Sequence, residues 1–313
     1  MNKAKVRIGI IGTGAIGGFY GALLARAGFD VHFLLRSEYA AVRDNGVQID
    51  SAVHGTLKVY PAQAYAHVGQ MPPCEWLLVG AKTTANAELA AVIAQAAAPG
   101  AKVVLLQNGL DVEEQLRPLL PEHLHLLGGL CFICVNRTAP GVVQHQALGA
   151  VNLGYHSGPA ASGAVRQGIT DEGAALFREA GIESQAMANL AQARWQKLVW
   201  NVPYNGLSVL LRASTTPLMA DPNSRALIQA LMADVVEGAR ACGHELPSGY
   251  AEHLFAITAQ MPDYWPSMYH DFAQQRPLEL AAIYAAPLAR ARAAGCSLPR
   301  IEALHQALAF LSA

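Results

Sequence analysis

A glycine-rich loop near the N-terminus constrains the fold of this chain more than any other stretch. The β-branched run Val6–Ile11 predicts a buried strand, and the loop Gly12–Gly17 follows it directly. The residues from Ile16 to Ala27 have the apolar spacing of a helix, and Val31–Leu35 predicts a second strand. A GxGxxG loop between a strand and a helix indicates a dinucleotide-binding βαβ unit.

Each glycine of this loop has a physical reason to be there. Gly12 permits a tight turn, Gly14 lets the backbone approach a pyrophosphate, and Gly17 lets the helix pack close to the strand. The N–H groups at the start of the helix then face the phosphates. The residues expected to contact the cofactor here are Gly12, Thr13, Gly14, Ala15, Ile16 and Gly17.

The residue that ends the second strand selects the cofactor. A chain that selects NAD usually places Asp or Glu about twenty residues after the last glycine, where the carboxylate accepts from the ribose 2′-hydroxyl. This chain has Arg36 at the end of the strand, followed by Ser37. A guanidinium can form a bidentate contact with a 2′-phosphate, so the sequence favours NADP(H) over NAD. The alternative, an exposed loop charge, is weaker in this βαβ context.

Two further strands of the predicted sheet also end in polar residues. Trp76–Gly80 precedes Lys82, and Val103–Leu106 precedes Asn108. Ligands of open parallel sheets bind beyond the carboxyl ends of the strands. We therefore expect Lys82 to contact a cofactor phosphate or ribose, and Asn108 to bind the nicotinamide ribose or a substrate carbonyl. Either residue read alone is equally typical of a solvated loop.

The composition excludes several other classes of protein. Hydrophobic residues make up 52% of the 313 residues and charged residues 14%, with a net charge of −1, as in a compact globular protein. Lysine and arginine are scattered, so no basic surface for nucleic acid or an anionic membrane is expected. We find no signal peptide pattern and no apolar run of about eighteen residues, and we therefore expect a cytoplasmic protein.

Five cysteines make an odd number in a large chain that is poor in cysteine, which argues against a disulfide framework. Cys131 and Cys134 match a CxxC pattern, but they lie in an apolar run that predicts a strand. Residues three apart in a strand point to opposite faces, so buried structural cysteines are the favoured interpretation and no metal site is expected.

The composition changes near residue 185, where strand patterns give way to alanine-rich helical patterns. We therefore predict two domains, a dinucleotide-binding domain over residues 1–185 and a helical domain over 186–313. The predicted fold class is α/β, with a mostly parallel sheet followed by an all-helical domain. The apolar helical domain suits either a homodimer interface or a well-packed monomer.

The most informative predicted helix is Leu190–Leu211. Its polar residues fall within an arc of roughly 80°, and nearly all the rest of its circumference is apolar. Two asparagines one turn apart beside a lysine favour fixed hydrogen bonds over a simple solvent-exposed edge, because asparagine is a poor helix former. Pro203 should kink the helix at the level of this stripe. The stripe consists of Arg194, Lys197, Asn201, Asn205, Ser208 and Arg212.

These motifs together resemble the ketopantoate reductase (2-dehydropantoate 2-reductase) family. The resemblance covers essentially the whole chain. It rests on the glycine loop, on Lys82 and Gln107-Asn108-Gly109, on Lys197 with its two asparagines, and on Ser267 twelve residues before Glu279. It implies a Rossmann-type N-terminal domain, a C-terminal domain like that of 6-phosphogluconate dehydrogenase, and NADPH-dependent reduction of a 2-oxo acid.

The resemblance also implies roles for individual residues. Lys197 would be the general acid, and Asn108 and Asn201 would orient the ketone. The hydroxyl and carboxylate ends of the substrate would be held by Asn205, Ser267 and Glu279. Without the resemblance, Glu279 would be interpreted as a carboxylate on a helix surface after Pro277.

The chain departs from the family pattern near the predicted substrate pocket. Tyr264-Trp265-Pro266 precedes Ser267, where small or amide residues are common, and Leu280-Ala281-Ala282 follows Glu279, where an acidic residue is common. The reaction type is therefore better supported than the substrate. The alternatives are a paralogue that reduces another branched or aromatic 2-oxo acid, and a non-catalytic NADPH sensor. The retained Lys197 argues against a sensor, which has no need of a general acid.

Overall fold

The computed structural model describes residues 6–312, which form two compact units. The sheet unit contains the described residues of Met1–Gln107 together with Val112–Leu190. The helical unit contains Asn108–Asp111 together with the described residues of Ala191–Ala313. The short segment Asn108–Asp111 is therefore part of the helical unit, although it directly follows the end of a strand region of the sheet unit.

One sheet of ten strands forms the centre of the sheet unit. Nine of its strands follow the order β4-β3-β9-β8-β7-β6-β1-β2-β5, and β10 pairs with β9. The bounds are β1 Arg7–Ile11, β2 Asp30–Leu34, β3 Val47–Ser51, β4 Gly55–Val59, β5 Gln63–Tyr65, β6 Cys74–Val79, β7 Ala97–Leu105, β8 His125–Ala139, β9 Val142–Ser157 and β10 Ala186–Met187.

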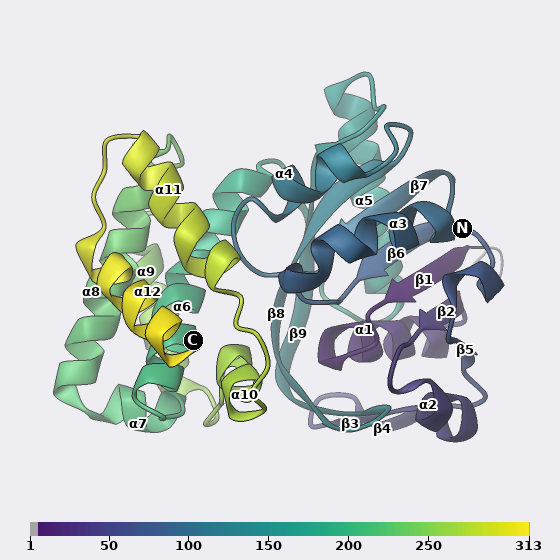
Figure 1. The fold of residues 1–313 in the computed structure, drawn as a ribbon, viewed down its shortest axis with the longest axis horizontal. Coiled ribbons are helices and arrows are strands. Elements are labelled where there is room, and N and C mark those ends of the chain that lie inside the picture. Colours follow the sequence, from purple (N-terminus) through teal and green to yellow (C-terminus); the bar gives the residue numbers. More distant parts are fainter. Residues whose placement is uncertain (1–5, 313) are drawn as a thin grey trace. The chain divides into compact units, whose positions relative to one another are not determined.

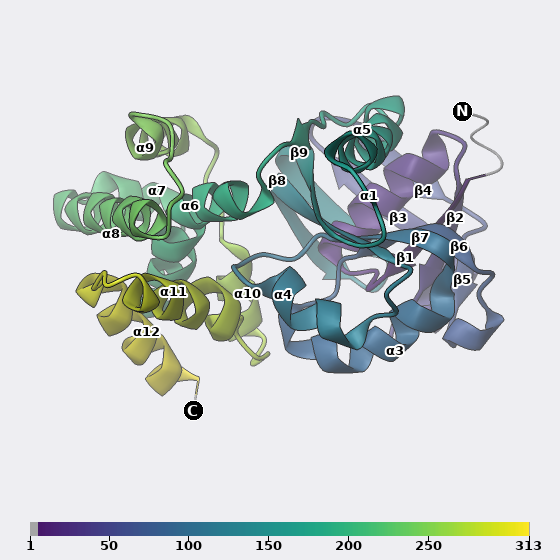
Figure 2. The ribbon, with the colours of Figure 1, turned by 90° about the horizontal axis from the view of Figure 1, so that it is seen from above.

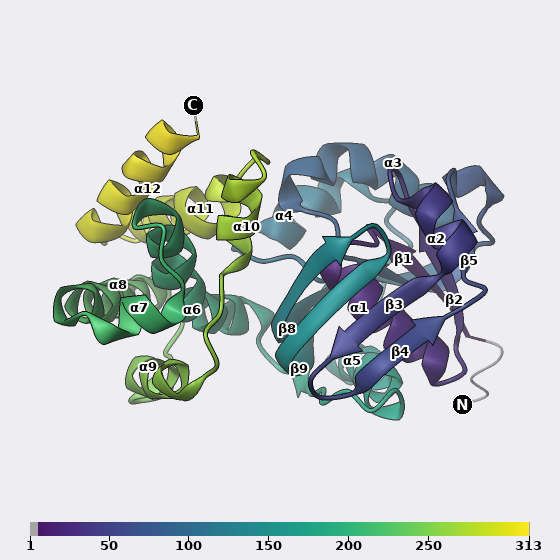
Figure 3. The ribbon, with the colours of Figure 1, turned by 90° about the horizontal axis from the view of Figure 1, so that it is seen from below.

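Parallel pairing dominates this sheet, as the sequence predicts. The run β7-β6-β1-β2 is parallel throughout, so the carboxyl ends of the four strands with predicted polar ends meet at one edge. The antiparallel pairs are β8 with β9 and β3 with β4. Figure 3 shows β3 and β4 beside the long β8–β9 hairpin. The antiparallel pair β3–β4 thus extends the main sheet, because β3 pairs in parallel with β9.

Val142–Ser157 form one continuous strand, β9. Leu148 and Gly149 have φ values of +65° and +133°. On the partner strand, Phe132 pairs with Ala150 and the next residue pairs with Leu148, so Gly149 has no partner residue in the ladder. Gly149 therefore forms a β-bulge within the strand.

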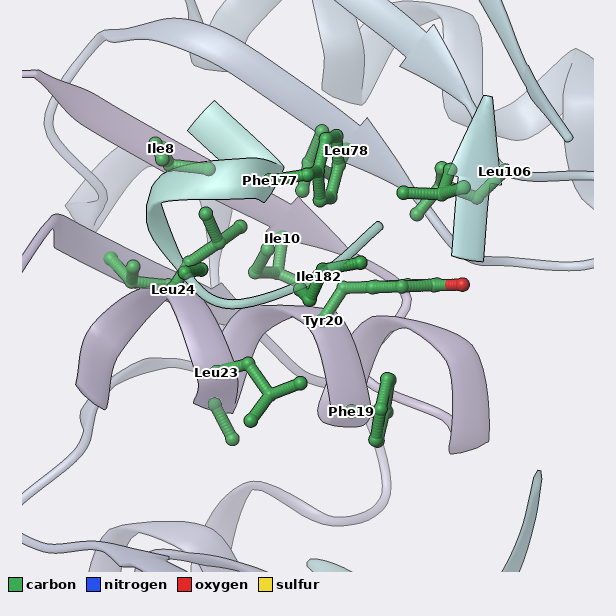
Figure 4. Packing of buried hydrophobic residues seen from close by; sticks show 14 of the residues in the cluster. Ile8, Ile10, Phe19, Tyr20, Leu23, Leu24, Leu78, Leu106, Phe177 and Ile182 are labelled. Atoms are coloured by element: carbon green, nitrogen blue, oxygen red, sulfur yellow. The ribbon is translucent and has the colours of Figure 1, made fainter. Parts of the chain in front are cut away.

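Helices cover both faces of the sheet. Figure 2 shows α1 (Ala15–Arg26) and α5 (Gly163–Glu179) on one face and α3 (Asn86–Ala96) on the other. Tyr20 of α1 and Phe177 of α5 meet edge to face, with their ring centroids 5.6 Å apart. Figure 4 shows these rings packed with aliphatic side chains of β1 and β6. The remaining helical segments are α2 Tyr39–Asn45, α4 Val112–Leu116 and the 3₁₀ turns η2 Val68–Gln70, η3 Thr83–Ala85 and η4 Arg117–Leu119.

The helical unit has its own core around α6, whose buried apolar side chains contact the helices that surround it. Figure 1 shows these helices in green to yellow. Their bounds are α6 Leu190–Leu210, α7 Thr215–Ala220, α8 Pro222–Ala241, α9 Tyr250–Gln260, α10 Ser267–Ala273, the π-helical turn η5 Ala281–Ala285, α11 Ala286–Ala293 and α12 Pro299–Leu311. Within residues 6–312, no helix has both the length and the apolar character that crossing a membrane requires.

Candidate active site

The glycine loop of the sheet unit has the close packing that its sequence predicts. Gly12 has a φ of +87°, and a Cβ atom built on it would lie 2.5 Å from the Ala81 backbone nitrogen. A Cβ on Gly17 would lie 2.3 Å from the Gly12 carbonyl oxygen. Neither position can accept a side chain without movement of the backbone.

Gly14 differs from these two glycines because it faces open space. A Cβ built on Gly14 would have no atom of the described residues within 4 Å. Gly14 is also the N-cap of α1, and no side chain among residues 6–312 caps it by a hydrogen bond. The N-terminus of a twelve-residue helix thus presents backbone N–H groups beside an unfilled position. This arrangement fits a pyrophosphate group.

The end of β2 is tied to the glycine loop. The Thr13 hydroxyl donates a hydrogen bond to the Leu34 carbonyl oxygen at 3.3 Å. Arg36 follows two residues later with an exposed side chain, so its guanidinium can reach a solvent-borne anion. This hydrogen bond therefore joins the loop predicted to bind the pyrophosphate to the strand end that leads to Arg36, which is predicted to bind the 2′-phosphate.

The ends of β6 and β7 are also joined by hydrogen bonds. The Gln107 side-chain nitrogen donates to the Ala81 carbonyl oxygen at 2.8 Å and to the Asn86 side-chain oxygen at 2.6 Å. Lys82, between them in sequence, precedes the turn η3 and is half-buried. The network fixes the loop that carries Lys82 at the same edge of the sheet as the glycine loop.

The segment Asn108–Asp111 is bound to the helical unit by three contacts. Gly109 has a φ of +104°, and a Cβ on it would lie 2.4 Å from the Ala282 Cβ. The Leu110 N–H donates to the Ala282 carbonyl oxygen at 2.9 Å, and the Arg290 guanidinium pairs with the Asp111 carboxylate at 3.0 Å. Asn108 is therefore held close to η5, the π-helical turn that follows Glu279. Sequence reasoning missed Asp111 and Arg290, because 179 residues separate them.

Most of the polar stripe on α6 is buried. The exposed fraction is 3% for Arg194, 4% for Asn201, 2% for Asn205 and 0% for Ser208. Lys197 is half-buried, and Arg212 lies exposed beyond the end of the helix. The interpretation of the stripe as a solvent-exposed edge is therefore wrong for these four residues. Buried polar groups on an otherwise apolar helix need specific partners.

The two asparagines of the stripe have different surroundings. The Asn205 side-chain oxygen accepts a hydrogen bond from the Met268 N–H at 3.3 Å, which connects α6 to the start of α10. The Asn201 side-chain nitrogen is buried and has no hydrogen-bond partner among the described residues. An unpaired buried amide is costly, so it indicates a donor reserved for a ligand or an ordered water.

Ser267 begins α10 and is half-buried. The segment before it is fixed by Asp263, whose carboxylate accepts from the Ser214 hydroxyl at 2.8 Å and from the Thr216 N–H at 2.9 Å. Burial alone would raise the pKa of Asp263, but the hydrogen bonds from Thr216 and Ser214 prevail and lower it. The backbone that carries Ser267 is thus anchored to the start of α7.

Glu279 is buried, with an exposed fraction of 5%. Its carbonyl oxygen accepts from the Ile283 N–H at 3.1 Å, at the entry to the π-helical turn η5. The interpretation of Glu279 as a carboxylate on a helix surface is therefore wrong. Turns of π-helix occur frequently at functional sites, which agrees with a functional role for this region.

The structure divides the predicted site residues between the two units. The glycine loop, Arg36 and Lys82 belong to the sheet unit. The residues expected to contact the substrate all belong to the helical unit, namely Asn108, Lys197, Asn201, Asn205, Ser267 and Glu279. Residues 6–312 contain no group of three or more histidine, cysteine, aspartate or glutamate residues that could hold a metal ion. The five cysteines all lie in the described part of the chain, and no disulfide joins them.

Two family models match this chain, one for each unit. Residues 8–158 match the model described as ketopantoate reductase PanE/ApbA, and residues 189–312 match the model of its C-terminal part. The chain is 41% identical to a 2-dehydropantoate 2-reductase of Nostoc sp. over 99% of this chain and 96% of that protein.

Solved structures show the same fold. The crystal structure of a 2-dehydropantoate 2-reductase from Geobacter metallireducens is 38% identical, with a TM-score of 0.89 over 97% of this chain and 99% of that chain. A D-mandelate dehydrogenase solved with NADH and anilino(oxo)acetate is 18% identical over 98% of both chains, with a TM-score of 0.84, and shows a shared fold only. The matches to both family models and to the Nostoc and Geobacter proteins place this chain in the ketopantoate reductase PanE/ApbA family.

Proposed function

We propose that this protein catalyses the NADPH-dependent reduction of 2-dehydropantoate (ketopantoate) to pantoate, a step of pantothenate synthesis in the cytoplasm. Membership of the family and the 41% identical Nostoc reductase support this activity. The observation that carries the proposal is the polar face of α6, where the buried, unpaired amide of Asn201 lies one turn after Lys197. Such a face offers a proton donor and a hydrogen-bond donor to one small ligand.

The sheet unit, which includes most of residues 1–185, is the proposed NADPH-binding domain. The open position at Gly14 and the uncapped start of α1 suit the pyrophosphate, while Arg36 suits the 2′-phosphate and Lys82 a phosphate or the ribose. Bound NADPH would supply the hydride for the reduction. The D-mandelate dehydrogenase that shares this fold was solved with NADH, so the preference for NADPH rests on Arg36.

The helical unit, which includes most of residues 186–313, is the proposed substrate-binding and catalytic domain. Reduction of a ketone places negative charge on its oxygen, so a protonated amine can stabilise that charge and donate the proton. We assign this role to Lys197. Asn201 and Asn108 are assigned to orient the ketone. The hydroxyl and carboxylate ends of the substrate are assigned to Asn205, Ser267 and Glu279.

The aromatic residues that precede Ser267 pack against other rings of the helical unit. The side chain of Trp265 stacks on Tyr269 with ring centroids 3.9 Å apart, and Tyr264 is buried near Trp200. These rings are used in packing within the helical unit. They therefore give no specific support to a paralogue that reduces aromatic 2-oxo acids.

The test follows NADPH absorbance with ketopantoate and a panel of branched and aromatic 2-oxo acids. We expect the wild type to prefer ketopantoate. Lys197→Ala should lower kcat by roughly 10²- to 10⁴-fold, the usual contribution of a general acid, with little change in NADPH affinity. Lys58→Ala is the matched control, because Lys58 is an exposed lysine of β4. Turnover of other 2-oxo acids but not of ketopantoate would contradict ketopantoate as the substrate. NADPH binding without turnover of any acid would contradict the enzymatic role.

A further inference from the structure

A carboxylate lies near the cofactor-selecting position, although Arg36 is closer to the end of β2. Glu38 is two residues after Arg36 and twenty-one residues after Gly17. By count it falls where a chain that selects NAD places its acidic residue, about twenty residues past the last glycine. The sequence therefore places two opposite signals close together: Arg36 favours a 2′-phosphate, and Glu38 favours a 2′-hydroxyl.

The structure shows where this carboxylate points. Glu38 is 7% exposed, and one of its carboxylate oxygens accepts from the Gly141 N–H at 3.0 Å. Its other oxygen forms an ion pair with the Arg137 guanidinium of β8. Gly141 is in the tight turn between β8 and β9, and its carbonyl oxygen accepts from the Gln48 N–H at 2.8 Å. The turn is thus held in place from both sides.

The neighbouring Arg36 is placed differently. Its side chain is exposed, and its carbonyl oxygen accepts from the Tyr39 N–H at 3.4 Å, which closes a turn around Ser37 and Glu38. Within this turn the cationic side chain is open to solvent, while the anionic side chain is buried and neutralised by Arg137. The two charges that would select opposite cofactors therefore differ in placement, because Glu38 is bonded to the β8–β9 hairpin and Arg36 faces solvent.

We propose that Arg137 is a positioning residue for cofactor selection, which keeps the Glu38 carboxylate away from the 2′ position of the adenine ribose. This inference rests on the proposed use of NADPH. A carboxylate released from Arg137 would repel the 2′-phosphate of NADPH and could accept from the 2′-hydroxyl of NADH. Exposed charges interact over about 8 Å at physiological ionic strength. A released Glu38 carboxylate, which lies in the same turn as Arg36, would therefore act on a phosphate bound by Arg36.

The test measures dissociation constants of NADPH and NADH by calorimetry, together with those of the fragments 2′,5′-ADP and 5′-ADP, so no turnover is required. Arg137→Met should weaken the binding of NADPH and 2′,5′-ADP by about 10-fold, and it should change the affinity for NADH and 5′-ADP by less than about 2-fold. Because the effect is electrostatic, the loss should shrink in 0.5 M salt, roughly to 3-fold or less.

Three further variants separate the inference from a general loss of structure. Arg137→Met combined with Glu38→Gln removes the released carboxylate and should restore NADPH affinity to within about 3-fold of the wild type. Arg137→Lys keeps the positive charge and should weaken NADPH less than Arg137→Met does. Arg43→Met is the matched control, because Arg43 pairs with Asp44 on the exposed side of the neighbouring helix α2.

The outcomes distinguish this inference from the proposed function. Equal affinity of the wild type for NADPH and NADH would contradict the proposed cofactor itself. A normal wild-type preference that Arg137→Met leaves unchanged, or an equal loss of both dinucleotides, would contradict the role of Arg137 alone. If Arg137→Met does not fold, Arg137→Lys decides the matter. A selective loss of NADPH that shrinks with salt supports the inference, and a loss common to both dinucleotides overturns it.

Discussion

The glycine-loop edge of the sheet unit and the polar face of α6 are built in opposite ways. The edge is made largely of backbone, with three glycines, the start of α1 and strand ends whose neighbours are fixed by the parallel sheet. The face of α6 is made of side chains that are buried within an apolar helix. A site made of backbone tolerates a larger side chain only where it faces open space. In a site made of side chains, the effect of a substitution depends on the hydrogen-bond partner of each polar atom.

The largest expected effect compares two glycines of the loop. Gly17→Val should destabilise the protein by about 3 kcal/mol or more, because even a Cβ atom would lie 2.3 Å from the Gly12 carbonyl oxygen. Gly14→Val should leave the free energy of unfolding nearly unchanged, because its side chain enters open space. Denaturant unfolding of both variants tests this contrast. Similar losses for the two would show that Gly14 is also a packing position.

The two asparagines of α6 should separate stability from binding. Asn205→Ala leaves the buried Met268 N–H without its partner and should cost about 1–3 kcal/mol of stability. Asn201→Ala removes an amide nitrogen that has no partner among the described residues, so it should be nearly neutral for stability. We expect Asn201→Ala to lower kcat/KM for ketopantoate by roughly 10-fold, as for one lost hydrogen bond. A marked loss of stability with normal turnover would assign Asn201 a purely structural role.

The smallest expected effect concerns acid sensitivity of the sheet unit. His145 is fully buried, and burial is the main reason that its pKa is lowered. Its Nε2–H donates to the Ala147 carbonyl oxygen at 3.0 Å, so Nδ1 accepts from the Ser51 hydroxyl at 2.8 Å, and protonation would remove this acceptor.

Because the folded pKa of His145 lies below the unfolded value of about 6.5, its contribution to stability is complete above that pH and is lost as the pH falls through the folded pKa. His145→Gln should make the unfolding free energy decline less steeply as the pH falls from about 7 to about 5. An identical pH dependence in the variant would show that His145 does not titrate in this range.

The sequence predicts the backbone site better than the side-chain site for a physical reason. Glycine spacing, strand patterns and helix spacing are local, so the βαβ unit around Gly12–Gly17 and the mostly parallel sheet could be predicted and are confirmed. The bulge at Gly149 could not be predicted, because a glycine with positive φ occurs in bulges and in turns and only the pairing with β8 distinguishes them.

Long-range contacts could not be predicted from the sequence. The ion pair of Glu38 with Arg137 and that of Asp111 with Arg290 join residues far apart in the chain, and no periodicity marks them. The burial of Glu279 likewise depends on the packing of the helical unit rather than on its own neighbours in sequence. The polar stripe of α6 could be predicted as a pattern, but the difference between Asn201 and Asn205 depends on where Met268 lies.

The central claim is that the two units hold different ligands, with the cofactor on the sheet unit and the catalytic side chains on the helical unit. Calorimetric NADPH affinity and ketopantoate turnover, measured side by side for Gly14→Val and Lys197→Ala, test it most directly. The claim predicts that Gly14→Val loses NADPH binding by about 100-fold or more, whereas Lys197→Ala loses turnover and binds NADPH like the wild type. Normal NADPH affinity in Gly14→Val, or normal turnover in Lys197→Ala, would contradict it.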